Sequence, residues 1–71
     1  QVVHLGDLMR LQNSEVTYAE LQRAGMIKKG RGIHVKILGD GELTKSVTIE
    51  KGIKVSKSAR EKIIKAGGTI R

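Results

Sequence analysis

The segment Gly39-Asp40-Gly41-Glu42 combines two glycines with two acids, a composition that can serve phosphate or metal binding. A Walker-type phosphate loop needs four residues between its glycines and then Lys-Ser/Thr at a helix start, and a dinucleotide fingerprint needs a third glycine before a helix. Neither pattern follows here, and the spacing of an EF-hand is absent. We interpret the segment as a turn, because glycine tolerates positive φ and aspartate bonds the local backbone. No metal and no cofactor are expected.

Two clusters of basic residues are better placed to do chemistry, and that chemistry is phosphate binding. The first cluster lies in the glycine-bearing stretch 28–32 and consists of Lys28, Lys29 and Arg31. Side chains and backbone N–H groups of such a loop can both approach phosphates. The second cluster surrounds a predicted helix start and consists of Lys54, Lys57, Arg60 and Lys62. A helix start with neighbouring cations favours an anion. The alternative for both clusters is a solvated basic surface.

Catalysis finds little support in the sequence. His4 and His34 have no cysteine partner and no acid at a recognisable spacing, and the serines are explained as helix caps. A chain this short can hardly enclose a dry pocket. Tyr18 is the only aromatic residue, so a base-stacking platform is also missing. We expect no enzyme and no catalytic residues, and recognition through phosphates, 2′-hydroxyls and shape.

Length and composition bound the class of protein. The 71 residues without cysteine predict one small domain, residues 1–71, whose core excludes only roughly 60% of the unfolded surface from water. The absence of cysteine points to a reducing, intracellular setting, or at least to a protein that makes no use of an oxidising one. The sequence has no apolar run long enough to cross a bilayer and no signal-peptide pattern at its start. Because the chain opens on Gln1 rather than methionine, we expect it to be part of a longer protein.

The net charge of +7 is distributed unevenly along the chain. Residues 1–27 hold two basic and three acidic residues, whereas residues 28–71 hold twelve basic and four acidic ones. Cations placed against a polyanion release its condensed counterions. Nucleic acid is therefore the favoured partner. The alternative function is a small basic module that binds an acidic protein, and a membrane surface is disfavoured because no stretch combines a wide apolar face with a basic one.

Two short helices are predicted from matching start and stop signals. Thr17 with Glu20, and Ser58 with Glu61, have the spacing of a capping box. Both segments run to an Ala-Gly pair, where glycine commonly ends a helix in the left-handed conformation. The faces expected to be buried are Tyr18, Leu21 and Ala24 in the first helix and Ala59, Ile63 and Ala66 in the second.

The middle of the chain alternates apolar and polar residues with period two, which indicates strands with one buried face. Strands are predicted at about 33–38 and 46–50, and we expect the glycine turn to fix their pairing. Further short strands are expected at 53–55 and in the final GTIR, and an extended segment at VVHL leads into a helical turn. The two helices can each cover a small sheet.

The stretches VKILGDGELTKSVTI, VSKSAREKI and KAGGTI resemble the C-terminal domain of the bacterial-type ribosomal large-subunit protein fifteen. The upstream VVHLGDL and VTYAELQRAGMIKKGRGIHVKIL fit the same family, so the resemblance covers essentially the whole chain. The strongest parts are the strand with its G-D-G-E-L-T-K turn and the S-K-S-A-x-E-K-I helix start, in that order. Two departures are the missing Gly-, Lys- and Arg-rich N-terminal arm and the smaller residues Gly52 and Val55.

The resemblance implies a small α/β domain of irregular β-β-α turns, with short helices packed on a small sheet. It implies a structural constituent of the large ribosomal subunit, in the cytoplasmic ribosome, that binds large-subunit rRNA, supports assembly and has other large-subunit proteins as neighbours. We expect a monomer when the protein is isolated. The residues expected to neutralise rRNA phosphates are Lys28, Lys29, Arg31, Lys36, Lys45, Lys54, Lys57 and Arg60.

Overall fold

The computed structural model describes residues 1–30 and 32–71. Its elements, in chain order, are β1 (Val2–His4), the 3-10 helix η1 (Leu5–Arg10), β2 (Glu15–Val16), α1 (Tyr18–Arg23), β3 (Lys36–Leu38), β4 (Thr48–Ile49), β5 (Lys54–Val55), α2 (Lys57–Lys65) and β6 (Thr69–Ile70). Within these residues, no helix combines the length and the apolar character needed to span a membrane. The α/β class with short helices agrees with the sequence prediction.

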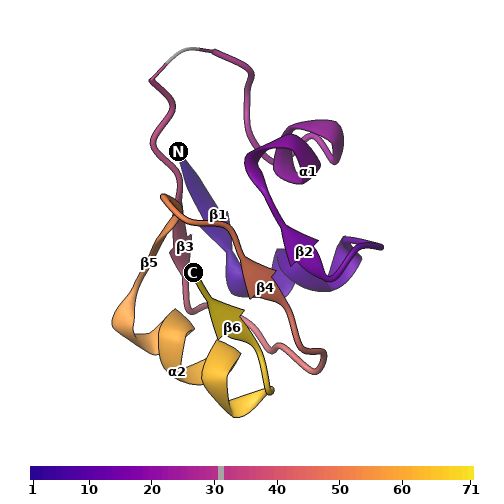
Figure 1. The fold of residues 1–71 in the computed structure, drawn as a ribbon, viewed down its shortest axis with the longest axis vertical. Coiled ribbons are helices and arrows are strands. Elements are labelled where there is room, and N and C mark those ends of the chain that lie inside the picture. Colours follow the sequence, from indigo (N-terminus) through magenta and orange to yellow (C-terminus); the bar gives the residue numbers. More distant parts are fainter. Residues whose placement is uncertain (31) are drawn as a thin grey trace.

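The strands form two three-stranded parallel sheets rather than one. The odd sheet has the order β1-β3-β5 and the even sheet has the order β2-β4-β6. Figure 1 shows β2, β4 and β6 as a front layer, with β1 and β3 behind it. The chain therefore changes sheet with each successive strand, so neighbours in a sheet are distant in sequence.

The prediction that the glycine turn pairs its two flanking strands is wrong. The strand before the turn is β3 in the odd sheet, and the strand after it is β4 in the even sheet. Instead, β3 pairs with β1 and β5, and β4 pairs with β2 and β6. A period-two pattern reports which face of a strand is buried, but it does not report which strand lies beside it. The turn carries the chain from one sheet to the other.

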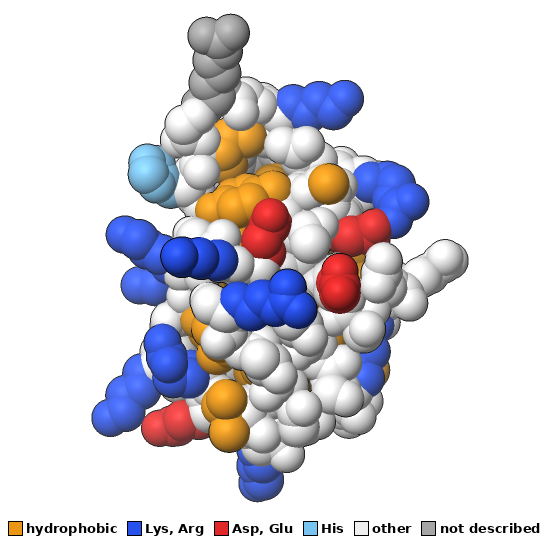
Figure 2. All heavy atoms as spheres, viewed as in Figure 1, with side chains coloured by type: hydrophobic (Ala, Val, Ile, Leu, Met, Phe, Trp, Pro, Cys, Tyr) orange, Lys and Arg blue, Asp and Glu red, His pale blue; other side chains and the backbone are white. Residues whose placement is uncertain are grey.

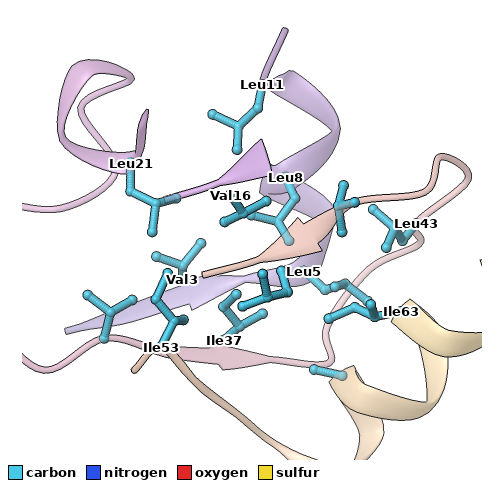
Figure 3. Packing of buried hydrophobic residues seen from close by; sticks show 14 of the residues in the cluster. Val3, Leu5, Leu8, Leu11, Val16, Leu21, Ile37, Leu43, Ile53 and Ile63 are labelled. Carbon is cyan, nitrogen blue, oxygen red and sulfur yellow. The ribbon is translucent and has the colours of Figure 1, made fainter. Parts of the chain in front are cut away.

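Each sheet turns one row of aliphatic side chains inward. In the odd sheet the register aligns Val3, Ile37 and Val55, and in the even sheet it aligns Val16, Ile49 and Ile70. Both rows belong to or pack against one buried cluster, which also includes Leu5, Leu8, Leu21 and Ile63 (Figure 3). Because side chains alternate along a strand, the residues that flank these rows face away from the core.

The first helix begins as predicted. The Thr17 hydroxyl accepts a hydrogen bond from the Glu20 backbone N–H at 3.1 Å. Leu21 is fully buried and Tyr18 packs against the core. Ala24, however, is exposed, because the helix ends at Arg23 and Ala24 is its C-cap before Gly25 at φ +75°. The predicted burial of Ala24 is therefore wrong.

The second helix begins earlier than the sequence analysis predicted. Ser56, not Ser58, is its N-cap and accepts a hydrogen bond from the Ala59 N–H at 3.2 Å. Ser56 also donates its own N–H to the carbonyl of Ile37 at 2.9 Å, so it is the last residue held by the odd sheet. The helix starts directly after that bond, and this places Ser58 inside its first turn. The predicted capping role of Ser58 is wrong.

Candidate nucleic-acid interface

The outward face of the odd sheet brings two of the predicted phosphate-binding residues together. Lys36 on β3 and Lys54 on β5 are register partners, and both are exposed. Adjacent strands lie about 4.8 Å apart, so the two side chains leave the sheet as neighbours. On the other side of Lys36 lies its β1 partner Val2, which is 52% exposed. The sequence analysis predicted both lysines as phosphate contacts but did not predict that they are adjacent.

The loop that carries Lys28 and Lys29 is tied to this sheet by Gln1. The side-chain amide of Gln1 accepts a hydrogen bond from the Lys28 N–H at 2.8 Å and donates to the Lys28 carbonyl at 3.4 Å. Its backbone carbonyl accepts the Lys36 N–H at 2.9 Å, and its backbone nitrogen donates to the His34 carbonyl at 2.7 Å. Gln1 thus positions the Lys28 backbone beside the strand that bears Lys36. Sequence reasoning missed this residue, because nothing local to Gln1 predicts contacts 27 or more positions away.

The remaining cations of the two predicted clusters have different settings. Lys29 is exposed in the loop next to Lys28, and Arg31 lies outside the described residues. Lys57 and Arg60 are exposed in the first turns of α2, directly after β5. Figure 2 shows that Lys and Arg side chains gather along the margin of the molecule where β5 and α2 lie. The cluster at the helix start is therefore continuous along the chain with the lysine on β5.

Two lysines direct their ammonium groups at the backbone instead of the solvent. Lys45, one of the predicted phosphate contacts, is half-buried and its Nζ donates to the carbonyl of Leu11. Lys62 donates to the carbonyls of Gly39 at 2.7 Å and Gly41 at 2.9 Å. A phosphate contact by either lysine would compete with these hydrogen bonds. Lys45 consequently has a structural role that its sequence position did not reveal.

The glycine turn is held in place by two other elements. Lys62 on α2 binds two of its carbonyls, and the Gly6 N–H of η1 donates to the Asp40 carbonyl at 2.9 Å. The Asp40 carboxylate lies 3.3 Å from Nδ1 of His4, and both side chains are largely exposed. Within residues 1–30 and 32–71, no three His, Cys, Asp or Glu side chains are grouped as metal ligands. The hydrogen bonds from Lys62 and Gly6 thus fix the backbone of the turn.

Gly39 shows why this turn requires glycine. A Cβ built on Gly39 would lie 2.2 Å from the Ser58 hydroxyl oxygen and 2.9 Å from the Ala59 backbone nitrogen. The turn therefore packs directly against the first turn of α2, closer than any side chain allows. Its glycines serve a close approach between two elements, which is a structural rather than a ligand-binding use.

The outward face of the even sheet has a different chemistry. Its first row consists of Glu15, Thr48 and Thr69, which are register partners. A hollow on this face is lined by Glu15, Thr17, Thr48, Glu50, Lys51 and Arg71, so acids and bases are balanced there. Glu50 is already engaged, since its Oε2 accepts the Tyr18 N–H at 2.8 Å at the start of α1. Figure 2 shows acidic side chains near the middle of this face.

Comparison with known proteins adds independent information. A model of the family described as ribosomal proteins 50S-L15 and 50S-L18e, together with a 60S counterpart, matches residues 2–71. The large ribosomal subunit protein uL15 of Opitutus terrae is 48% identical over 69 residues, covering 94% of this chain and 45% of that protein. The protein of the same name from Desulforapulum autotrophicum is 47% identical over 70 residues, covering 97% of this chain and 47% of that protein. The uL15 protein of Bifidobacterium adolescentis is 44% identical over 72 residues, or 99% of this chain and 47% of that protein. The chain spans about half the length of the curated relatives it matches.

Proposed function

We propose, from the premise that the chain belongs to the family of ribosomal proteins 50S-L15 and 50S-L18e, that it is a structural component of the large ribosomal subunit. The family membership confirms the resemblance predicted from the residues, and the family is one of ribosomal proteins, not of enzymes. In the finer form of the proposal, the chain binds large-subunit rRNA and supports subunit assembly. The cytoplasmic ribosome is its site of action, with other large-subunit proteins as neighbours.

The observation that carries the proposal is the family match from residue 2 to residue 71. The charge of the chain supports it, because a net charge of +7 favours a polyanionic partner. The aromatic content supports the mode of binding. With Tyr18 as the only aromatic side chain, base stacking contributes little, so phosphate, 2′-hydroxyl and shape contacts carry recognition.

The proposed mechanism is electrostatic neutralisation of the RNA backbone. Each cation placed against a phosphate releases condensed counterions, and the free energy of that release falls as the salt concentration rises. The residues proposed for these contacts are Lys28, Lys29, Arg31, Lys36, Lys54, Lys57 and Arg60. Lys45 stays a proposed contact only if it gives up its bond to the Leu11 carbonyl.

The experiment that tests this function is a titration of the isolated chain, expected to be a monomer, with large-subunit rRNA and with an unrelated RNA duplex. The titrations are repeated at several salt concentrations. The proposal expects a steep dependence of log Kobs on log salt, together with tighter binding to the rRNA. A flat salt dependence with no RNA preference would contradict it and favour an acidic protein as partner.

A further inference from the structure

The odd sheet leaves one of its faces uncovered, which is unusual for a parallel sheet. Parallel sheets occur almost only with both faces covered, because their connections place other elements on each side. Here the inward row, with Val3 and Ile37 at its centre, packs into the core. The outward row stays accessible, since Val2 is 52% exposed and Lys36 and Lys54 are exposed. The outward row of the even sheet is accessible as well, at Glu15 and Thr69, so exposure alone does not decide which of the two faces a partner covers.

The charges on the outward face of the odd sheet indicate what kind of partner would bind there. The outward positions of the three described strands are Val2, His4, Lys36, Leu38 and Lys54, and they include two lysines and no acid. The carboxylate of Asp40, just beyond β3, is placed 3.3 Å from His4. Two adjacent ammonium groups without a carboxylate between them are suited to two neighbouring phosphates.

The apolar residues of the face indicate which part of a nucleic acid would lie against it. Val2 stands beside Lys36 in the first outward row, and the partly buried Leu38 stands beside His4 in the second. Neither Val2 nor Leu38 is aromatic, so they cannot stack on a base. An exposed aliphatic side chain next to paired cations fits the sugar-phosphate backbone of RNA, where apolar sugar carbons alternate with phosphates.

The loop that follows α1 adjoins the edge of the odd sheet. Through Gln1, the backbone of Lys28 is fixed next to the edge of the odd sheet by hydrogen bonds of 2.8 and 3.4 Å. The Lys28 side chain is exposed at that position. A further basic residue thus lies at the edge of the odd sheet, next to β1.

We propose that the outward face of the odd sheet is the surface that lies against the RNA backbone, with Lys36 and Lys54 at neighbouring phosphates and Val2 against a ribose. This inference rests on the proposed function, because it assigns a face to the RNA. The even sheet, whose outward face balances acids and bases, faces away from the RNA in this arrangement.

The test compares matched pairs of substitutions in the RNA titration. The variant Lys36→Gln/Lys54→Gln removes two charges from the face, and Lys51→Gln/Lys65→Gln removes two charges from exposed positions elsewhere. Losing two phosphate contacts lowers the magnitude of the salt slope by roughly 1.4 to 1.8. We expect that change in the first variant and a much smaller one in the second. Circular dichroism of each variant checks that the fold is intact.

A second matched pair keeps both lysines and adds a carboxylate. Val2→Glu places it between the RNA and the odd sheet, and Thr69→Glu places it on the even sheet at another exposed position. We expect Val2→Glu to weaken RNA binding and Thr69→Glu to leave it nearly unchanged. Equal effects within both pairs, with the unsubstituted chain binding normally, would overturn the assigned face while leaving the proposed function intact. Failure of the unsubstituted chain to bind rRNA would instead contradict the proposed function.

Discussion

The odd and even sheets have the same inward pattern and different outward chemistry. Inward, each presents aliphatic side chains, with Ile37 and Ile49 fully buried at the centres of the two rows. Outward, the odd sheet presents paired lysines and no acid, whereas the even sheet presents threonines and a balance of charges, with Glu15 and Glu50 beside Lys51 and Arg71. The inward rows therefore determine the fold, and the outward rows distinguish the face proposed for RNA from the face proposed to point away from it.

If the two inward rows share one core, truncating a side chain in either row should lower the free energy of unfolding by a similar amount. These are the largest effects that we expect. Ile37→Ala and Ile49→Ala should each lower the free energy of unfolding by about 2–5 kcal/mol, because each leaves a cavity in the shared core. For a domain of this size that is a large part of a total of about 4–10 kcal/mol. The measurement is urea unfolding followed by far-UV circular dichroism, since the chain has no tryptophan.

The conservative variants Ile37→Val and Ile49→Val are the controls, with an expected loss of about 0.5–1.5 kcal/mol each. If one alanine variant were nearly as stable as the unsubstituted chain, the two sheets would not share one core. That outcome would show that the two inward rows contribute unequally to stability.

Two glycines lie close to opposite ends of α2, Gly39 beside its first turn and Gly68 after its last. We expect substitution by alanine to destabilise the protein to a different extent at each. A Cβ on Gly68, just before β6, would lie 2.6 Å from the Val47 carbonyl oxygen and 3.0 Å from the Ile63 carbonyl oxygen, both backbone atoms. A Cβ on Gly39, just after β3, meets the Ser58 hydroxyl first. Gly68→Ala should cost about 2–3 kcal/mol of unfolding free energy, because it meets two backbone oxygens. Gly39→Ala should cost about 1–2 kcal/mol, because its nearest neighbour is a side chain that can move, with one backbone atom, the Ala59 nitrogen, at 2.9 Å.

Gly30→Ala serves as the control for both glycine variants. Among the residues that the structure describes, a Cβ there would meet the Ile33 side chain alone, at 3.7 Å and beyond, which is ordinary contact. Its unfolding midpoint should stay close to that of the unsubstituted chain. A larger loss from Gly30→Ala than from Gly68→Ala would contradict the close packing around Gly68.

Lys62 distinguishes a structural lysine from the lysines proposed for RNA. Lys62→Met removes the hydrogen bonds to the carbonyls of Gly39 and Gly41, and we expect a loss of about 1 kcal/mol in unfolding free energy. The exposed Lys65→Met, which changes the net charge equally, should be within about 0.5 kcal/mol of the unsubstituted chain. Equal unfolding curves for the two variants would show that the Lys62 bonds contribute nothing.

Glu50 gives the smallest expected effect, on the even sheet. Its carboxylate accepts the Tyr18 N–H at the start of α1, where a negative charge is favourable. Glu50→Gln keeps a weaker acceptor and should lower the unfolding free energy by roughly 0.5 kcal/mol. The exposed Glu15→Gln should have a smaller effect, so the order of the two thermal midpoints is the readout. A reversed order would mean that Glu50 does not stabilise the helix.

Local signals of the sequence predicted the local parts of the fold. The period-two pattern identified the buried side of β3 and β4, and the Thr17 and Glu20 spacing placed the start of α1. The start of α2 was misplaced because Ser56 and Ser58 are both suitable caps, and a tertiary bond from Ser56 to Ile37 decides between them. Strand partners were not predictable, since every pair is parallel and joins distant segments.

The candidate site was predictable by residue type and not by arrangement. The placement of charge led to the prediction that Lys28, Lys36 and Lys54 contact RNA, which stays a prediction, whereas their positions relative to one another depend on strand register and on the side chain of Gln1. Lys45 was predicted from its place beside the turn, where the structure gives it a backbone acceptor in Leu11. Such long-range hydrogen bonds leave no periodic trace in a single sequence.

Whether the odd sheet faces the RNA can be measured most directly with a probe attached to a single introduced cysteine. The chain suits this measurement because it has no cysteine of its own. Val2→Cys on the odd sheet and Thr69→Cys on the even sheet each provide one exposed thiol to carry an iron-based hydroxyl-radical probe. Each labelled protein is incorporated into large ribosomal subunits, and cleavage of the rRNA is mapped. We expect strong, localised cleavage from position 2 and weak cleavage from position 69. Stronger cleavage from position 69 than from position 2 would contradict the assignment of the odd sheet to the RNA.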